Sequence, residues 1–235
     1  MRLHVGLAVV LLALGVFLRA ANLGAPAFCC DEFYDVFAAR SWLAGEGLRV
    51  PGREYTRARL NTYLTAGAFA LLGESEGAAR VPALLFGVGT MALAYAVGLA
   101  LFGPVAGVVA LTLVALSADA VDVSRFARLY SPLTFFSLLA AFATYRAVEG
   151  RDEGPRPTAA RGRWLALAAA AGLLATHLHP IALALGPAVL AYATLRSAAL
   201  AVGGRRAAAR PYAWLALALA VAAAAALLLP AVRGR

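Results

Sequence analysis

The sequence predicts an all-α fold, a polytopic bundle of about seven transmembrane helices with interfacial helices in the first outer loop. Hydrophobic residues make up 63% of the 235 positions and charged residues only 14%, and the mean hydropathy is +0.79. Soluble domains are far less apolar. The apolar runs are rich in Ala and Leu and lack the alternation of barrel strands. Because a backbone in lipid must satisfy its own polar groups, these runs must be helices.

Seven runs are uncharged or nearly so, and most approach the length needed to cross a hydrocarbon core of roughly 30 Å. They cover residues 3–18, 81–102, 105–118, 132–148, 164–178, 181–195 and 212–229. The first run also fits a cleaved signal peptide. Because the six later runs need no removable leader, we expect the first run to stay as a helix.

The arginines in the loops predict the orientation. If Met1 is cytoplasmic, the loops 146–163 and 196–210 are cytoplasmic too, and they carry five and four arginines against three acids. Positive charge of this kind is typical of short cytoplasmic loops. We therefore predict one membrane domain over residues 1–235, with a first outer loop at 20–80 and a second at 119–131.

The outer loops hold most of the acidic residues, nine of the twelve. Acids and arginines gathered at span ends on one side indicate a polar cavity at the outer interface, with solvated loops as the alternative. The moderately apolar run 61–73 is too short to span comfortably. We expect it to form a helix in the outer interface, beside a second amphipathic helix at 31–45.

The formal charge of +9 comes from arginines that lie between apolar runs, without an aromatic and basic surface module. We therefore expect membrane lipid, and no nucleic acid, as a partner. Cys29 and Cys30 are adjacent, so they form either a strained vicinal bridge or free thiols. His177 and His179 lie on different sides of a helix, which favours a helix-end role over a metal site. No cofactor is expected, and the need for a divalent metal is left open.

Asp31 and Glu32 follow the first apolar run directly and begin a helical pattern. Paired carboxylates at the lipid boundary, with arginines nearby, suit a general base or a cation site. The alternative for Asp31 is the N-cap of a helix over residues 32–43.

The order of these and later motifs resembles membrane glycosyltransferases of the C-type fold, especially the protein O-mannosyltransferase and lipid A aminoarabinose transferase group. The resemblance covers about residues 3–180. Its motifs are a first helix, Asp31-Glu32, a helix ending at Gly73, Arg80-Val81-Pro82, a helix with Tyr95, Leu101-Phe102-Gly103 and a loop at 124–130. Members of the group usually have more spans and often an outer soluble domain, so the chain resembles a truncated N-terminal core.

The resemblance implies transfer of a hexosyl or pentosyl group from a polyprenyl-phosphate donor to a protein, lipid or glycan acceptor. It places the reaction on the outer face of a bacterial cytoplasmic membrane. The chain has no Gly-rich phosphate loop of the kind that binds nucleotides. A transporter or flippase of lipid-linked sugars is an alternative, although it should show two matching halves with broken helices. A non-catalytic membrane scaffold is a further alternative.

By position, the resemblance implies that Asp31 is the catalytic carboxylate, which deprotonates or orients the acceptor hydroxyl, and that Glu32 assists it. Asp35, one helical turn further on, is expected to matter far less. The lipid phosphate leaves as an anion and needs a cation. The expected substrate-binding residues are Arg57, Arg59, Arg80, Asp122, Arg125, Arg128 and Tyr130.

Each substrate-binding residue also has a structural alternative. The arginines, together with Arg53, suit anionic lipid headgroups. Asp119 and Asp122 are three apart on one helix face, and they suit capping or simple solvation as well as a place in the site. Tyr130 suits the aromatic belt at a membrane interface.

Overall fold

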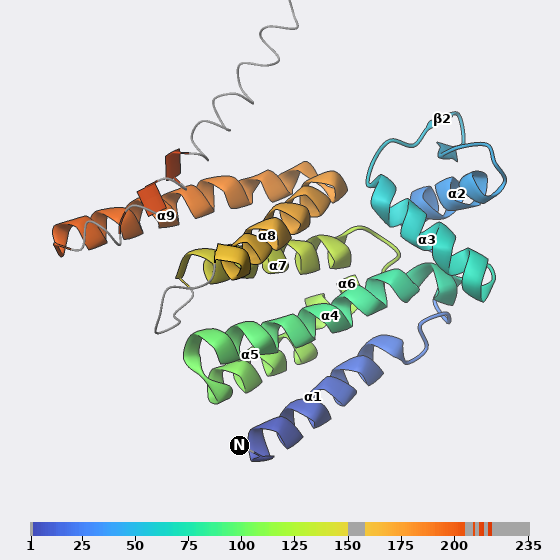
Figure 1. Ribbon diagram of the computed structural model, residues 1–235. Coiled ribbons are helices and arrows are strands. Elements are labelled where there is room, and N and C mark those ends of the chain that lie inside the picture. The colour runs from blue at the N-terminus through green and yellow to red at the C-terminus, as the bar shows by residue number, and fades with distance from the viewer. Residues whose placement is uncertain (1, 150–157, 205–208, 210–211, 214–215, 218–235) are drawn as a thin grey trace, which may run out of the picture. The chain divides into compact units, whose positions relative to one another are not determined.

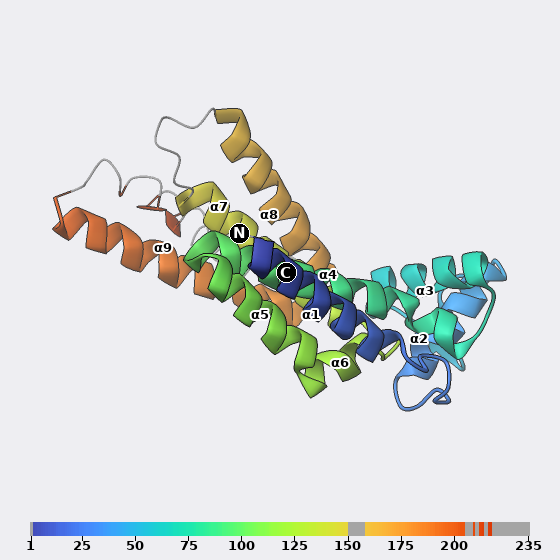
Figure 2. The ribbon, with the colours of Figure 1, turned by 90° about the horizontal axis from the view of Figure 1, so that it is seen from below.

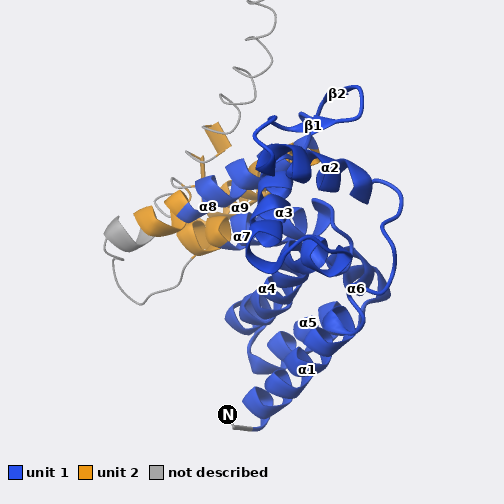
Figure 3. Cartoon of the chain, turned by 90° about the vertical axis from the view of Figure 1, so that its right-hand side faces the viewer, with its two compact units in different colours: residues 1–142, 167–180 blue, residues 143–166, 181–235 orange. Residues whose placement is uncertain are grey.

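The computed structural model describes residues 2–149, 158–204, 209, 212–213 and 216–217. Within these ranges the chain consists of helices, one short two-stranded hairpin and the loops that join these elements (Figure 1). This confirms the all-α prediction. The chain divides into two compact units, residues 1–142 with 167–180 and residues 143–166 with 181–235 (Figure 3). Helices α7 (Tyr130–Glu149) and α8 (Thr158–Leu178) contribute residues to both units.

In the first unit, α1 (Arg2–Ala20) packs against α4 (Glu76–Phe102) and α5 (Pro104–Leu116), as Figures 1 and 2 show. Helices α4 and α5 form a hairpin that turns at Gly103, where φ is +96°. Glycine adopts this conformation without steric cost, and a proline directly after it suits the first position of the next helix.

The α4–α5 hairpin is closely packed because glycines stand at its contact. A Cβ on Gly98 would lie 2.6 Å from the Ala106 carbonyl oxygen, and one on Gly107 would lie 3.0 Å from the Tyr95 carbonyl oxygen. Small residues at such positions let helix backbones approach closely in a membrane.

Arg19 fixes the C-terminal end of α1. Its guanidinium is fully buried. It donates to the carbonyl oxygens of Val114 at 2.8 Å and of Ala115 at 3.1 Å in α5, and to the Ser124 hydroxyl at 3.1 Å in α6 (Ala118–Ser124). A charge without water needs such bonds, so this arginine joins three helices.

Three of the described helical segments are long and apolar enough to cross a membrane: Leu3–Ala20, Glu76–Phe102 and Pro180–Val202. The last joins the 3-10 turn η1 (Pro180–Ala184) to α9 (Leu185–Val202). Helices α5 and α6, bent by 64°, pass the same test together. The first six predicted runs all coincide with helices. Helices α7 and α8, at the fourth and fifth runs, are not among these candidate spans. Most of the seventh run, 212–229, lies outside the described residues, so the number seven stays a prediction.

In the second unit, the end of α7 contacts α9 through one acidic side chain. Glu149 accepts hydrogen bonds from Arg196 at 2.8 Å and from the Tyr192 hydroxyl. This polar contact joins the two helices near the predicted cytoplasmic loops.

The first outer loop contains the two expected helices, α2 (Glu32–Leu43) and α3 (Arg59–Leu72). Between them lies an antiparallel hairpin of β1 (Arg49–Val50) and β2 (Arg53–Glu54), in which Arg49 pairs with Glu54 and Val50 with Arg53. The two helices and the start of α4 share a small apolar core, formed by Val36, Ala39, Ala66, Phe69, Ala78, Ala79 and Ala127. Ala127 belongs to the second outer loop, so the two loops meet here.

Candidate active site in the outer loops

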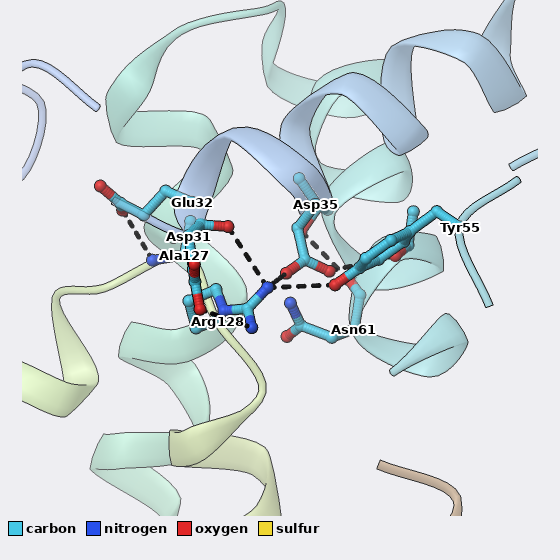
Figure 4. Close-up of polar contacts among 9 residues, drawn as sticks. Asp31, Glu32, Asp35, Tyr55, Asn61, Ala127 and Arg128 are labelled. Atoms are coloured by element: carbon cyan, nitrogen blue, oxygen red, sulfur yellow. Dashed lines mark hydrogen bonds and ion pairs between the residues drawn. The ribbon is translucent and has the colours of Figure 1, made fainter. Parts of the chain in front are cut away.

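The N-cap position and the first turn of α2 present three carboxylates in two directions (Figure 4). Asp31 and Asp35 are four residues apart and therefore share one face of the helix. Both contact Arg128 of the second outer loop, while Glu32 contacts Arg80 of α4. The two outer loops thus meet through paired charges.

Glu32 is fully buried and accepts four hydrogen bonds. Arg80 donates two of them, at 2.9 Å each, and the backbone N–H groups of Ala127 and Cys29 donate the others at 2.8 and 3.1 Å. Burial alone would raise the pKa of Glu32, but these hydrogen bonds hold its pKa below the ordinary value. Glu32 is therefore an ionised carboxylate with its acceptor capacity largely used within the chain.

Arg80 uses all five of its N–H donors on the protein. Besides the two bonds to Glu32, it donates to the carbonyl oxygens of Leu23 at 2.9 Å, Pro26 at 2.7 Å and Ala27 at 3.2 Å. Arginine has five donors and no acceptor. The Glu32–Arg80 pair therefore ties the loop after α1 to the first turn of α2 and to α4.

Arg128 stands between the two aspartates. Its Nη1 donates to Asp35 at 2.7 Å, to the Tyr55 hydroxyl at 3.0 Å and to the Asp31 carbonyl oxygen at 3.3 Å. Its Nη2 lies 3.4 Å from the Asp31 carboxylate. Asp35 is fully buried, and Thr62 of α3 donates to it at 3.1 Å. Burial raises the pKa of Asp35 against the lowering effect of the Arg128 charge.

Asp31 differs from the other two carboxylates because its side chain is 58% exposed. Asp31 occupies the N-cap position of α2, but its carboxylate accepts no capping hydrogen bond in the part of the chain that the structure describes. The side chain is instead next to Arg128 (Figure 4). An accessible carboxylate beside a fixed cation has lone pairs available for a hydroxyl proton.

The other predicted site residues are more exposed than Glu32, Arg80 and Arg128. Arg125 is half-buried and donates to the Leu18 carbonyl oxygen at 2.8 Å, at the end of α1. Arg59 is exposed and lies 3.6 Å from Glu54. Arg57, Asp119, Asp122 and Tyr130 are exposed as well. The structure thus brings together Asp31, Glu32, Arg80 and Arg128, whereas no ion pair joins the other predicted residues to this cluster within the part of the chain that the structure describes.

Asp119 lines a cavity of about 270 Å³ between α1, α4, α5, α6 and the start of α7. Arg19, Ser117, Ser131 and Thr134 contribute to the same lining. The surface that lines this hollow is mainly apolar, so the polar cavity expected from the sequence stays a prediction.

Three residues of the site were not predicted from the sequence: Tyr55, Asn61 and Thr62. Asp35 was expected to matter far less than Asp31, but it contacts both Arg128 and Thr62. Asn61 and Thr62 are polar residues on the buried face of α3, a pattern that signals a polar network. Within the described residues, the buried atoms Asn61 Nδ2 and Arg128 Nε form no hydrogen bond. No comparable signal in the sequence marks Tyr55, whose hydroxyl reaches Arg128 from the hairpin segment.

The cysteines and histidines do not assemble a site with these carboxylates. Cys29 and Cys30 are exposed free thiols. His177 lies in the last turn of α8, as expected of a helix-end residue. Across the described ranges, no group of three His, Cys, Asp or Glu side chains is arranged to hold a metal ion.

Residues 57–229 match the family model described as dolichyl-phosphate-mannose-protein mannosyltransferase. The match includes Arg57, Arg80, Arg128 and both helices of the α4–α5 hairpin, and it begins after Asp31 and Glu32. No curated protein and no solved structure matches the chain.

Proposed function

Because the chain belongs to the dolichyl-phosphate-mannose-protein mannosyltransferase family, we propose that it transfers a sugar from a polyprenyl-phosphate donor to an acceptor hydroxyl. Membership of the family makes the chain a membrane glycosyltransferase. The proposal adds the lipid-phosphate donor, a protein, lipid or glycan acceptor, and the outer face of a bacterial cytoplasmic membrane as the place of reaction. The arginine-rich loops expected in the cytoplasm support this orientation.

The proposed base is Asp31, and the observation that supports it is its exposure. Of the three carboxylates in the first turn of α2, Asp31 alone is exposed, while Glu32 and Asp35 are fully buried. In the reaction, the acceptor oxygen forms a bond to the anomeric carbon and its proton passes to the Asp31 carboxylate. The bond from that carbon to the phosphate oxygen breaks, and the polyprenyl phosphate leaves as an anion.

Glu32 and Arg80 support this site without contacting the reacting atoms. All five Arg80 donors are already used within the chain, so we assign Arg80 to holding the loop before Asp31 and not to the substrate. Glu32 assists Asp31 in the same indirect way, because it anchors the helix turn that carries Asp31.

The leaving phosphate needs an accessible cation. Arg57 and Arg59 are exposed at the start of α3, and Arg125 is half-buried beside the end of α1. Arg128 is 7% exposed and is already shared by two carboxylates. We therefore propose Arg57, Arg59 and Arg125 as the main phosphate ligands, with Asp122 and Tyr130 near the sugar.

Membranes from expressing cells test this function directly when they are incubated with a panel of radiolabelled polyprenyl-phosphate hexoses and pentoses. We expect label to move from one donor to a product that chloroform–methanol does not extract or that migrates as a new lipid. Membranes without the protein provide the control. If the labelled donor only changes sides of the bilayer and stays intact, the chain is a flippase and the proposed transfer is wrong.

A further inference from the structure

Asp35 is the most completely enclosed member of the charged cluster. It lies on the inner face of α2 and is fully buried. Arg128 Nη1 donates to its Oδ2 at 2.7 Å, and Thr62 donates to its Oδ1 at 3.1 Å. Both carboxylate oxygens are thus fixed, one by the second outer loop and one by α3.

Arg128 holds the two aspartates unequally. The contact to Asp35 is 2.7 Å, typical of a strong charge-assisted hydrogen bond, while the contact to the Asp31 carboxylate is 3.4 Å. Tyr55 adds a third contact to the same Nη1, at 3.0 Å. The guanidinium is therefore oriented by Asp35 and Tyr55, and Asp31 contacts its other nitrogen more loosely.

The difference between these two Arg128 contacts matters because Asp31 is the proposed base. A guanidinium that is free to turn forms a bidentate pair with a carboxylate, and such a pair would occupy the oxygens of Asp31 that must accept a proton. Because Nη1 of Arg128 donates to Asp35, the Asp31 carboxylate contacts only Nη2. The Asp31 side chain therefore remains 58% exposed.

We propose that Asp35 is a positioning residue for sugar transfer. It holds Arg128 so that this arginine orients the Asp31 carboxylate without forming a bidentate pair with it. The inference rests on the proposed function, in which Asp31 accepts the hydroxyl proton. It also reverses the minor importance that the sequence suggests for Asp35. Asp35 acts through Arg128, and it touches neither donor nor acceptor.

The test compares Asp35→Asn, Asp31→Asn and the double variant in membranes with matched protein amounts, using radiolabelled polyprenyl-phosphate mannose as the donor probe. A small misplacement of a catalytic group costs about 10²-fold in rate. We expect Asp35→Asn to lower kcat by about 10- to 100-fold while KM stays within about twofold. The double variant should transfer no more slowly than Asp31→Asn alone, because residues that act as a unit are not additive. Asp35→Glu, which keeps the charge, should recover part of the rate.

Thr62→Val provides a second variant that keeps the carboxylate and removes only its hydrogen bond from α3. It should lower kcat several-fold, and it takes the place of Asp35→Asn if that variant does not accumulate. Asp152→Asn, in the loop expected on the cytoplasmic side, is the matched control and should leave kcat unchanged.

The outcomes separate the two proposals. If Asp31→Asn loses transfer but Asp35→Asn and Thr62→Val keep the wild-type kcat, the role of Asp35 is rejected and the base stands. If the Asp35→Asn loss multiplies in full onto that of Asp31→Asn, Asp35 does not act through Asp31 and the inference is again rejected. If Asp31→Asn transfers normally, Asp31 is not the base, and the inference about Asp35 fails with that assignment, while the transfer activity itself stands.

Discussion

Arg80 donates to both carboxylate oxygens of Glu32 at 2.9 Å, and neither residue is exposed to solvent by more than 2%. This ion pair joins the start of α2 to α4, and its remaining hydrogen bonds reach the loop after α1. A buried pair of this kind is costly to break on one side only, because the other charge is left uncompensated.

Glu32→Gln is therefore expected to destabilise the fold. Removal of one partner from a buried ion pair costs about 3–5 kcal/mol, which should appear as a large fall in the thermal unfolding midpoint of the purified protein in detergent. The matched control is Glu54→Gln, because Glu54 faces Arg59 at 3.6 Å in an exposed pair and should contribute less than about 1 kcal/mol. Equal shifts in the two variants would contradict the anchoring role.

The same pair predicts a pH dependence of stability. The pKa of Glu32 is lower in the folded chain than its ordinary value of about 4.5. Ionised Glu32 therefore contributes stability above that ordinary value, and the contribution is lost as the pH falls through the folded pKa. Asp35, whose pKa is raised, has the opposite effect, so the difference between wild type and Glu32→Gln isolates Glu32. That difference in unfolding midpoint should shrink from pH 7 to pH 3, and a constant difference would contradict the account.

The α4–α5 contact gives a prediction about packing. Gly98→Leu introduces a side chain whose first atom would lie 2.6 Å from the Ala106 carbonyl oxygen. Overpacking of this kind costs about 1–3 kcal/mol. Gly6→Leu in α1 is the control, since a Cβ there has nothing within 4 Å. We expect the unfolding midpoint in detergent to fall for Gly98→Leu alone, and equal midpoints would show that the hairpin is not packed through Gly98.

The orientation of the chain is tested by topology reporters. A reporter inserted after Gly154 should give a cytoplasmic signal, and one near Gly52, in the turn between β1 and β2, an external signal. The arginines of the loops at 146–163 and 196–210 are the physical reason. The reverse pair of signals would move Asp31 and Arg128 to the cytoplasmic side and overturn the proposed place of reaction.

Much of the fold follows from the sequence because hydropathy reports directly on membrane helices. The first six apolar runs coincide with helices, and Gly73 and Gly103 mark helix ends as the motifs suggest. The bend between α5 and α6 was not predicted, because the run 105–118 is apolar up to Ser117 and conceals the break there.

The site was less predictable than the fold. Asp31, Glu32, Arg80 and Arg128 were among the predicted site residues, and they lie together in the structure. Which of them pair with one another was not visible in the sequence, because Arg128 lies almost a hundred residues after Asp31 and pairs with it only through tertiary structure. Asp35 was undervalued for the same reason, since its burial depends on α3 and on the second outer loop.

The central claim is that Asp31 accepts the proton of the acceptor hydroxyl, and Asp31→Asn tests it most directly. The amide keeps the size of the side chain but lacks the charge that accepts a proton, and the absence of a capping bond from Asp31 predicts a normal amount of inserted protein. Transfer from the polyprenyl-phosphate sugar, measured in membranes with matched protein amounts, should fall by about 10²- to 10⁴-fold, while Asp152→Asn retains wild-type transfer. Near-normal transfer by Asp31→Asn would contradict the account.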